Sequence, residues 1–183
     1  MAVRYKTTRQ NNEIYFITFT ILDWQPIFIN DQYCSLVYRW FDYLKNSYGN
    51  KLYGYAIMPN HIHCLIKLSD QSPDVSVMVR EGKRFLAYAI AAKLKEDGRQ
   101  EILNHFKTKA DTKNKANYKV FNTRFDSLVI QSRKFFLQKL NYLHFNPCQK
   151  KWQLADKPEN YKHSSAANYI LGTGCYKVEA MDF

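Results

Sequence analysis

The chain has 183 residues, of which 46% are hydrophobic and 16% aromatic, enough to build one domain with a substantial core. It contains no run of about 18 or more apolar residues and begins without the apolar block of a secretory signal, so we expect a cytoplasmic protein with no membrane span. The four cysteines are widely spaced and form no CxxC pair, which argues against a disulfide framework or a thiolate zinc site.

The formal net charge of +11 is concentrated in one part of the chain. Residues 80–151 contain 17 Lys and Arg against 6 Asp and Glu, whereas the rest of the chain contains 10 of each. Positive charge segregated in this way favours a polyanionic partner, most often nucleic acid, because lysine and arginine near phosphates release counterions. The alternative is a solvated basic surface that only aids solubility.

The predicted secondary structure follows the order βαββαβα. Short β-branched and aromatic runs indicate strands, and apolar residues three and four positions apart indicate helices. In chain order the elements are a strand at 14–21, a helix at 31–48, strands at 52–58 and 61–68, a helix at 76–95, a strand at 118–121 and a helix at 127–146. This order is typical of an α+β, ferredoxin-like domain with helices packed on an antiparallel sheet.

We expect residues 1–183 to form a single domain, without internal repeats or low-complexity segments. Within it, residues 1–12 form a basic N-terminal tail, and the lysine-rich residues 97–117 are expected to be an irregular, mobile insertion. Residues 148–183 form a C-terminal tail that is expected to pack back on the domain.

The predicted hairpin carries the first candidate site residues. Pro59 and Asn60 suit the centre of a tight turn. The next strand then places His61 and His63 on one face, opposite its more apolar row, because side chains alternate along a strand. Two such imidazoles are a weak signal by themselves, since a pair on an open sheet face can simply be solvated or hydrogen-bonded.

The last predicted helix carries the second set of candidate site residues. Its N-cap is expected to be Asp126 or Ser127. Helical geometry places Tyr142 roughly 140° from the centre of the apolar stripe, with Asn146 one turn further on. An ordinary surface tyrosine would also fit this pattern. Together with the two histidines, however, the amide oxygen of Asn146 would complete three donors that leave positions open on a divalent cation, Mg²⁺ or Mn²⁺ rather than zinc.

A tyrosine beside such an ion suggests a specific reaction. A phenol is almost entirely un-ionised at neutral pH, so its attack on phosphorus needs orientation, a proton acceptor or a nearby cation. A cation neutralises charge on the phosphate and can stabilise the departing 3′ oxygen. Tyr142 would become joined to the 5′ phosphate, and the strand could then be rejoined elsewhere without ATP.

These segments resemble a known family. YGYAIMPNHIHCLIKL is similar to the His-hydrophobic-His motif of the single-tyrosine HUH transposases, and VFNTRFDSLVIQSRKFFLQKLNYLHFNP is similar to their catalytic helix with its Tyr-x-x-x-Asn-Pro ending. YKHSSAANY resembles the Ser-Ser-bearing tail of the REP-associated branch. The resemblance implies a metal-dependent single-strand DNA endonuclease and strand transferase. It implies His61, His63 and Asn146 as metal ligands and Tyr142 as the nucleophile.

The sequence departs from the family pattern at two places. Much of the superfamily carries glutamine where this chain has Asn146, which keeps an amide oxygen but shortens its reach. After Asn-Pro the family often has an apolar residue, a basic residue and Ala-Gly, whereas residues 148–152 here read CQKKW. The first departure bears on metal preference and the second on recognition of the DNA end.

The charge and the resemblance together imply single-stranded or hairpin-tipped DNA as the partner, in a bacterial, nucleoid-associated protein. The REP-associated branch is thought to act as monomers, so a monomer is favoured over a homodimer. Charge and position alone select the candidate phosphate contacts, which are Arg80, Lys83, Arg84, Arg124, Arg133, Lys134 and Lys139.

Two other functions fit part of the sequence. A ferredoxin-like sheet with aromatic residues and a basic rim also serves non-catalytic proteins that bind single-stranded nucleic acid, although an RNP-type aromatic motif is absent. A metallohydrolase using only His61 and His63 would release free 5′ phosphate without a tyrosine adduct. It is less favoured because no carboxylate lies near the pair in sequence to act as a base.

Overall fold

The computed structural model describes residues 12–110 and 116–181. Its centre is a four-stranded antiparallel sheet with the strand order β2-β3-β1-β4. The strands are β1 (Ile14–Thr20), β2 (Lys51–Met58), β3 (His61–Lys67) and β4 (Asp126–Val129). Helices connect β1 to β2 and β3 to β4, so the α+β, ferredoxin-like class predicted from the sequence is confirmed.

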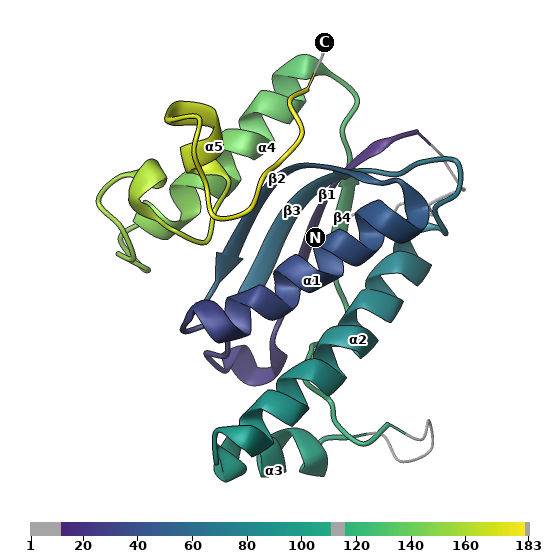
Figure 1. Ribbon diagram of the computed structural model, residues 1–183, viewed down its shortest axis with the longest axis vertical. Coiled ribbons are helices and arrows are strands. Elements are labelled where there is room, and N and C mark those ends of the chain that lie inside the picture. Colours follow the sequence, from purple (N-terminus) through teal and green to yellow (C-terminus); the bar gives the residue numbers. More distant parts are fainter. Residues whose placement is uncertain (1–11, 111–115, 182–183) are drawn as a thin grey trace.

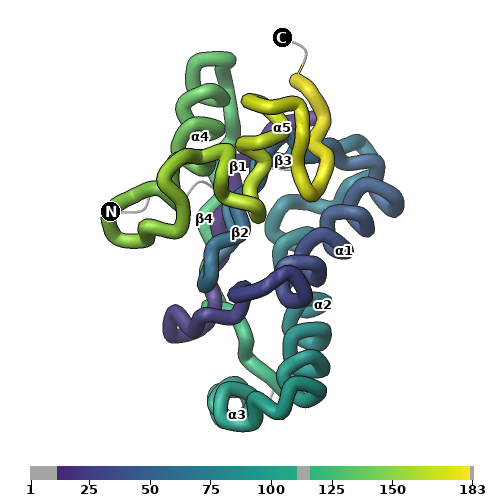
Figure 2. The backbone as a smooth tube through the Cα atoms, turned by 60° about the vertical axis from the view of Figure 1, so that its left-hand side comes forward, coloured from purple at the N-terminus to yellow at the C-terminus, as the bar shows by residue number. Residues whose placement is uncertain are grey.

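Helices cover both faces of the sheet (Figure 1). One face carries α1 (Asp31–Tyr48) and α2 (Val75–Glu96), and the other carries α4 (Arg133–Phe145), with the short α5 (Ala166–Ile170) nearby. Figure 2 separates these layers, with α1 and α2 on one side of the strands and α4 on the other. No helix in the described part of the chain is both long enough and apolar enough to cross a membrane.

Alternation along the strands divides the core into two clusters. Ile62 and Cys64 of β3 belong to the larger cluster, under α1 and α2. Leu65 belongs to the smaller cluster, where it is joined by Phe136 and Leu140 of α4. Odd-numbered residues of β3 therefore face α4, which places the histidine pair beneath that helix.

The elements of the first half agree closely with the prediction. The helix α1 has the predicted bounds, because both of its ends carry strong local signals. The side chain of Asn30 accepts a hydrogen bond from the backbone N–H of Tyr33, and Gly49 ends the helix in the left-handed region at φ 68°. The hairpin turns at Pro59 and Asn60 as expected.

The segment that leads into α4 differs from the prediction. The strand expected at 118–121 is absent, and within that range only Phe121 forms a β-bridge, to Ile21. The fourth strand is β4, whose residues were assigned to the start of the last helix. Its side chains alternate in exposure and its backbone pairs with β1, so long-range pairing prevails over the local helical spacing.

The helix α4 consequently begins six residues later than the predicted helix, at Arg133 instead of residue 127. Its N-cap is Ser132, whose hydroxyl accepts a hydrogen bond from the backbone N–H of Phe135 at 3.2 Å. Asp126 and Ser127, the caps expected from the sequence, lie in β4 instead.

The insertion at 97–117 is partly helical, so the prediction of irregular structure is wrong for α3 (Gln100–Thr108). Leu103 and Phe106 of α3 are buried at helical spacing, which gives this polar segment an apolar edge to pack. Residues 111–115 of the insertion, and residues 1–11 of the expected N-terminal tail, lie outside the described part of the chain.

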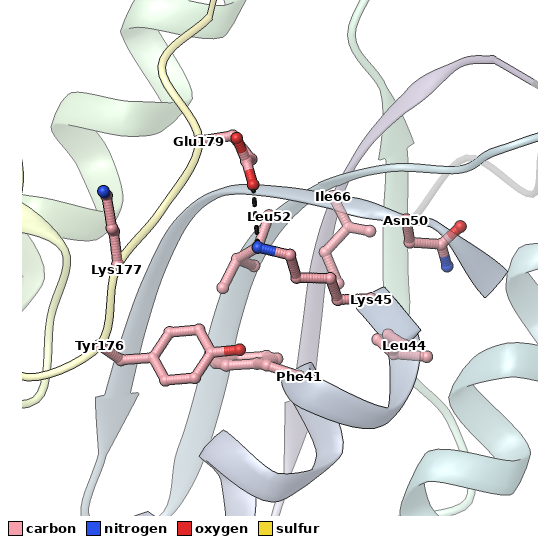
Figure 3. A pocket seen from close by; sticks show the side chains of 9 residues that line it. All are labelled: Phe41, Leu44, Lys45, Asn50, Leu52, Ile66, Tyr176, Lys177 and Glu179. Atoms are coloured by element: carbon pink, nitrogen blue, oxygen red, sulfur yellow. Dashed lines mark hydrogen bonds and ion pairs between the residues drawn. The ribbon is translucent and has the colours of Figure 1, made fainter. Parts of the chain in front are cut away.

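The C-terminal segment lies along the free edge of β2. The backbone N–H of Ile57 donates to the carbonyl of His163 at 2.8 Å, and that of Ser165 donates to the carbonyl of Tyr55 at 2.9 Å. Further on, Glu179 pairs with Lys45 of α1 at 3.2 Å (Figure 3). The edge strand of the sheet is therefore covered by the chain's own tail.

Candidate active site

His61 and His63 lie at the start of β3, on the sheet face covered by α4. Their side chains are buried, with 5% and 3% of each residue exposed, and the ring centroids are 4.7 Å apart at 84° to each other. Fully buried Leu143 and nearly buried Leu140 belong to the smaller core cluster, which holds α4 over this face. The imidazoles are thus held within a packed environment rather than on an open sheet face.

A hydrogen bond sets the tautomer of His61. Its Nδ1 lies 2.7 Å from Oδ1 of Asn60, whose amide nitrogen donates to the carbonyl of Trp24 at 3.2 Å and so fixes the amide orientation. Because an amide oxygen only accepts, Nδ1 carries the proton and Nε2 keeps its lone pair. Burial, with a smaller effect from Lys151, lowers the pKa of His61 to about 4, so the ring is neutral at pH 7 and can act as a ligand.

His63 is held from both sides of its ring. Its Nδ1 lies 2.7 Å from Oγ1 of Thr18, its partner residue on β1, and its Nε2 lies 2.7 Å from Nδ2 of Asn146. When Nδ1 donates to the threonine hydroxyl, Nε2 is the bare nitrogen. Burial, followed by the nearby His61, holds the pKa of His63 well below its usual value, so this ring is also neutral.

Asn146 stands at the C-terminal end of α4 and is 1% exposed. Its amide nitrogen faces His63, while its Oδ1 is buried without a hydrogen-bond partner among the described residues. An unsatisfied buried acceptor costs about 1–3 kcal/mol. Turning the amide over would present the oxygen to the same imidazole nitrogen, an arrangement that is favourable when a cation lies between them.

These donors fit a divalent cation. Two neutral imidazole nitrogens are available, and the Asn146 amide, whose nitrogen lies 2.7 Å from His63 Nε2, would supply an oxygen in its turned-over orientation. The described residues contain no group of three or more His, Cys, Asp or Glu that could hold a metal ion, so Asn146 is needed to complete the set. A site of this kind would leave coordination positions for phosphate oxygens and water.

Tyr142 lies on α4 one turn before Asn146. Its ring meets His63 edge-on, with centroids 5.4 Å apart at 77°, and meets Phe16 at 5.9 Å. The residue is 42% exposed, and Nζ of Lys139 lies 5.8 Å from its ring centroid. The structure thus brings a solvent-accessible phenol beside His63, which itself meets Asn146 from 83 positions further along the chain.

The seven predicted phosphate contacts do not form one surface. Arg80, Lys83 and Arg84 on α2 line a cavity of about 750 Å³, and Arg124 is exposed in the loop before β4. The other three, Arg133, Lys134 and Lys139, lie on α4, across the sheet from α2. Of the seven, only Lys139 has its charged group beside the Tyr142 ring.

Lys83 has a role inside the protein that its position in a basic segment does not reveal. Its Nζ donates to the carbonyl oxygens of Asn122, Thr123 and Arg124 at 2.9, 3.2 and 3.1 Å. It also lies 5.3 Å from the ring centroid of Phe125. All three ammonium protons are therefore directed at the loop before β4, which gives Lys83 a structural role in addition to the phosphate contact predicted from the sequence.

Sequence reasoning missed the residues that hold the site in place. Thr18 and Asn60 hold the two rings; Asn60 was predicted only as a turn residue, and no local pattern marks Thr18. His144, for which the sequence pattern indicates no role, is buried with its Nε2 2.8 Å from the hydroxyl of Ser165. That hydroxyl also accepts from the backbone N–H of Tyr55 at 3.0 Å, so His144 ties α4 to the tail and to β2. The Ser-Ser pair in the tail was the sequence feature that could have pointed to this contact, because its second residue, Ser165, is the partner of His144.

Comparison with known proteins identifies a fold. No family model matches the sequence, and no curated protein matches it significantly. The solved structure of a REP-associated tyrosine transposase bound to a REP hairpin aligns with a TM-score of 0.67 at 18% identity, over 99% of this chain and 93% of that chain. A proposed transposase from Deinococcus radiodurans R1 aligns with a TM-score of 0.45 at 15% identity, over 78% of this chain and 95% of that one.

The first of these alignments spans almost the whole of both chains and includes the sheet, α4 and the tail. It agrees with the resemblance of the histidine and tyrosine segments to the single-tyrosine HUH transposases. The chain therefore has the fold of a REP-associated tyrosine transposase.

Proposed function

We propose that the protein is a transposase that cleaves and rejoins single-stranded DNA through Tyr142, with Mg²⁺ or Mn²⁺ held by His61, His63 and Asn146. The observation that carries the proposal is the contact of the Tyr142 ring with His63, whose Nε2 meets Asn146 at 2.7 Å. A phenol and an amide carried by α4 meet an imidazole from β3 where the fold has no structural need for a buried, unsatisfied oxygen.

The chemistry is an exchange of one phosphate ester for another. A bond forms between the Tyr142 oxygen and phosphorus as the bond from phosphorus to the 3′ oxygen breaks; the phenol releases its proton, and the departing 3′ oxygen takes one up. The bound cation would neutralise charge on the phosphate. Attack by another 3′ hydroxyl on the phosphotyrosine reverses the exchange and rejoins the strand.

The side chains around Tyr142 support this role. The ring packs against Phe16 and His63, which orients it, while its exposure leaves it accessible to a large substrate. The ammonium of Lys139 lies near the same ring, where it favours both the developing phenolate and an approaching phosphate.

The proposed substrate is single-stranded DNA next to a hairpin. The structure of similar fold is that of a transposase bound to a REP hairpin. The net charge of +11 supplies the attraction for phosphates on which such binding depends. We also propose a monomer in the bacterial cytoplasm, associated with the nucleoid.

The test is a covalent adduct. The protein is incubated with Mn²⁺ and end-labelled hairpin oligonucleotides from the DNA flanking its gene, and adducts are separated under denaturing conditions. We expect the parent protein to form an adduct that EDTA abolishes. The Tyr142→Phe variant should form no adduct although it still binds DNA. Tyr88→Phe, a similarly exposed tyrosine on α2, is the matched control and keeps the adduct.

Other outcomes would identify the rival functions. An undiminished adduct in Tyr142→Phe would remove Tyr142 from the nucleophile role. Equal binding with and without EDTA, and no covalent product, would favour a non-catalytic binder. Release of free 5′ phosphate without an adduct would favour hydrolysis by the histidine pair.

A further inference from the structure

Two tryptophans from separate parts of the chain contact the ring of His61. Trp24, in the turn after β1, meets it edge-on with centroids 6.1 Å apart at 70°. Trp152, in the segment after α4, lies 5.4 Å away at 42°. The chain has three tryptophans, and the remaining one, Trp40, is buried in the larger core cluster. Both non-core tryptophans therefore flank one candidate metal ligand.

Trp24 is exposed in a backbone conformation that side chains rarely adopt. It is 58% exposed, and its φ of 57° follows a φ of 51° at Asp23. The left-handed region costs a residue other than glycine roughly 1–2 kcal/mol. The turn is held by the Trp24 carbonyl, which accepts from Asn60, and by Asp23, which lies 3.0 Å from His105 of α3. A strained turn that holds a large apolar ring in solvent beside a candidate site indicates a binding role.

Trp152 lies in a turn that is also strained. The next residue, Gln153, has a φ of 48°, and the backbone N–H of Trp152 donates to the carbonyl of Gln149 at 2.8 Å. Its indole nitrogen has no hydrogen-bond partner among the described residues. The Nζ of Lys151 lies 5.4 Å from its ring centroid, and Lys150 beside it is exposed. The second tryptophan thus brings positive charge close to His61.

A purely structural role explains only part of this arrangement. Partly exposed Trp152 shields His61 from water, which accounts for its contact with the imidazole. Shielding does not account for Trp24, which leaves more than half of its surface in solvent. The exposed indole of Trp24 and the lysine beside Trp152 both lie near His61, a combination that suits a ligand that is flat, aromatic and anionic, as an unpaired nucleotide is.

We propose that Trp24 and Trp152 form a stacking subsite for one unpaired nucleobase next to the phosphate that Tyr142 attacks. The inference rests on the proposed function and adds to it a place where the DNA strand is held in register. Trp24 supplies an indole surface available for stacking, and Trp152 contacts the same imidazole and bounds the site. Because stacking uses the π-face common to all bases, the subsite would select single strands over paired ones rather than one sequence over another.

The test asks whether removing a tryptophan and removing one particular base weaken DNA binding through the same contact. Binding is measured by fluorescence anisotropy in EDTA, in a Tyr142→Phe background, so that no cleavage intervenes. The probe is a hairpin with a single-stranded extension from the DNA flanking the gene, and each position of the extension is replaced in turn by an abasic spacer. We expect one position at which the spacer weakens binding roughly 5- to 150-fold.

Trp24→Ala should weaken binding to the intact probe by a similar factor and make the protein insensitive to the spacer at that position. Trp24→Phe keeps an aromatic face and should restore most of the affinity. Tyr43→Ala, an exposed aromatic residue of α1 across the sheet, is the matched control and should bind like the parent. Trp152→Leu should reduce the spacer effect at the same position.

Several results would overturn the subsite. The first is a Trp24→Ala variant that binds every probe as tightly as the parent. The second is a pair of independent effects, in which Trp24→Ala and the spacer weaken binding by factors that multiply at every position. The third is a parent protein that binds no probe. Thermal melting of each variant identifies a loss that comes from unfolding. If the effects of Trp24→Ala and of the spacer are coupled but the protein with Tyr142 forms no covalent adduct with DNA, the subsite stands and the catalytic proposal is rejected. If the adduct forms but the two effects are not coupled, only the subsite is rejected.

Discussion

Thr18 and His63 face each other across β1 and β3, and the threonine hydroxyl lies 2.7 Å from Nδ1 of the imidazole. This contact turns the other ring nitrogen toward Asn146, at the same distance on the opposite side. A group that holds the outer nitrogen of a ligating histidine sets both its tautomer and its orientation. The register of two strands therefore orients a side chain toward α4, which carries the proposed nucleophile.

Thr18→Val removes the hydroxyl and keeps the shape of the side chain. We expect the affinity for Mn²⁺ to fall roughly 10- to 100-fold, because His63 loses the partner that orients it. Titration calorimetry with Mn²⁺ measures the change, and Thr18→Ser, which keeps a hydroxyl, should recover most of the affinity. Equal affinity in Thr18→Val would show that the ring is oriented by packing alone.

Asn146→Ala removes the third proposed donor. We expect Mn²⁺ to raise the melting temperature of the parent protein but not that of this variant, since a cation stabilises only a folded state that binds it. Asn146→Asp supplies an oxygen with a full charge and should bind Mn²⁺ more tightly than the parent. A melting temperature that rises equally in Asn146→Ala and in the parent would exclude Asn146 as a ligand.

The stability of the metal-free protein should depend on pH below neutrality. Burial lowers the pKa of His61 and of His144 to about 4 from an ordinary value of 6.5. Between these values the unfolded chain binds protons that the folded chain does not, so stability should fall as the pH drops from about 6.5 to about 4. Each histidine contributes up to about 3 kcal/mol.

Urea unfolding in EDTA across this pH range measures the effect. His144→Gln should reduce the pH dependence of the free energy of unfolding by the equivalent of about one proton, because it removes one of the buried groups. A stability that stays constant between neutral pH and pH 5 would mean that these rings are protonated in the folded protein.

Lys83→Met tests the internal role of this lysine. The carbonyls of Asn122, Thr123 and Arg124 would lose their shared donor, and we expect a loss of about 2–3 kcal/mol in the free energy of unfolding, measured with urea. Arg80→Met, an exposed neighbour on α2, should change stability by less than about 0.5 kcal/mol. A variant that keeps full stability but loses DNA affinity would leave Lys83 as a phosphate contact alone.

Gly82→Ala should destabilise the protein although alanine is the better helix former. A Cβ at this position would lie 2.5 Å from Nε1 and 2.6 Å from Cε2 of Trp40, where α2 meets α1. Overpacking typically costs about 1–3 kcal/mol, against a gain in helix propensity of about 1 kcal/mol. Thermal melting measures the balance. The exposed Ala92 in the same helix is the control, since Ala92→Gly should lose only the propensity; a higher melting temperature in Gly82→Ala would contradict the close packing.

The sequence predicted best those elements whose signals are local and complete. The helix α1 carries an Asn cap at one end and a glycine at the other, and its bounds were predicted without error. The two-residue alternation of β3 placed both histidines on one face whatever the partner strands were. The short strand β4 lacked this advantage, because Asp126 and Ser132 both suit a helix N-cap and only pairing with β1 decides between them.

The site was predictable as residue types but not as an arrangement. Tyr142, His63 and Asn146 were chosen by pattern and resemblance, and the structure brings them into contact. The partners of the histidines depend on strand register and on the path of the hairpin turn, which no single segment encodes. Charge along the chain likewise could not show that α2 and α4 lie on opposite faces, or that Lys83 turns inward.

The backbone of residues 163–165 covers the outer edge of β2, and Ser165 in this segment is also the hydrogen-bond partner of His144. An uncovered edge strand presents unpaired N–H and C=O groups to which another chain can add. A chain truncated before residue 163 would therefore lose a hydrogen bond that holds α4 in place. It would also expose an unpaired strand edge to which other chains can bind. Self-association into insoluble material, rather than simple loss of activity, would be the first consequence of such a truncation.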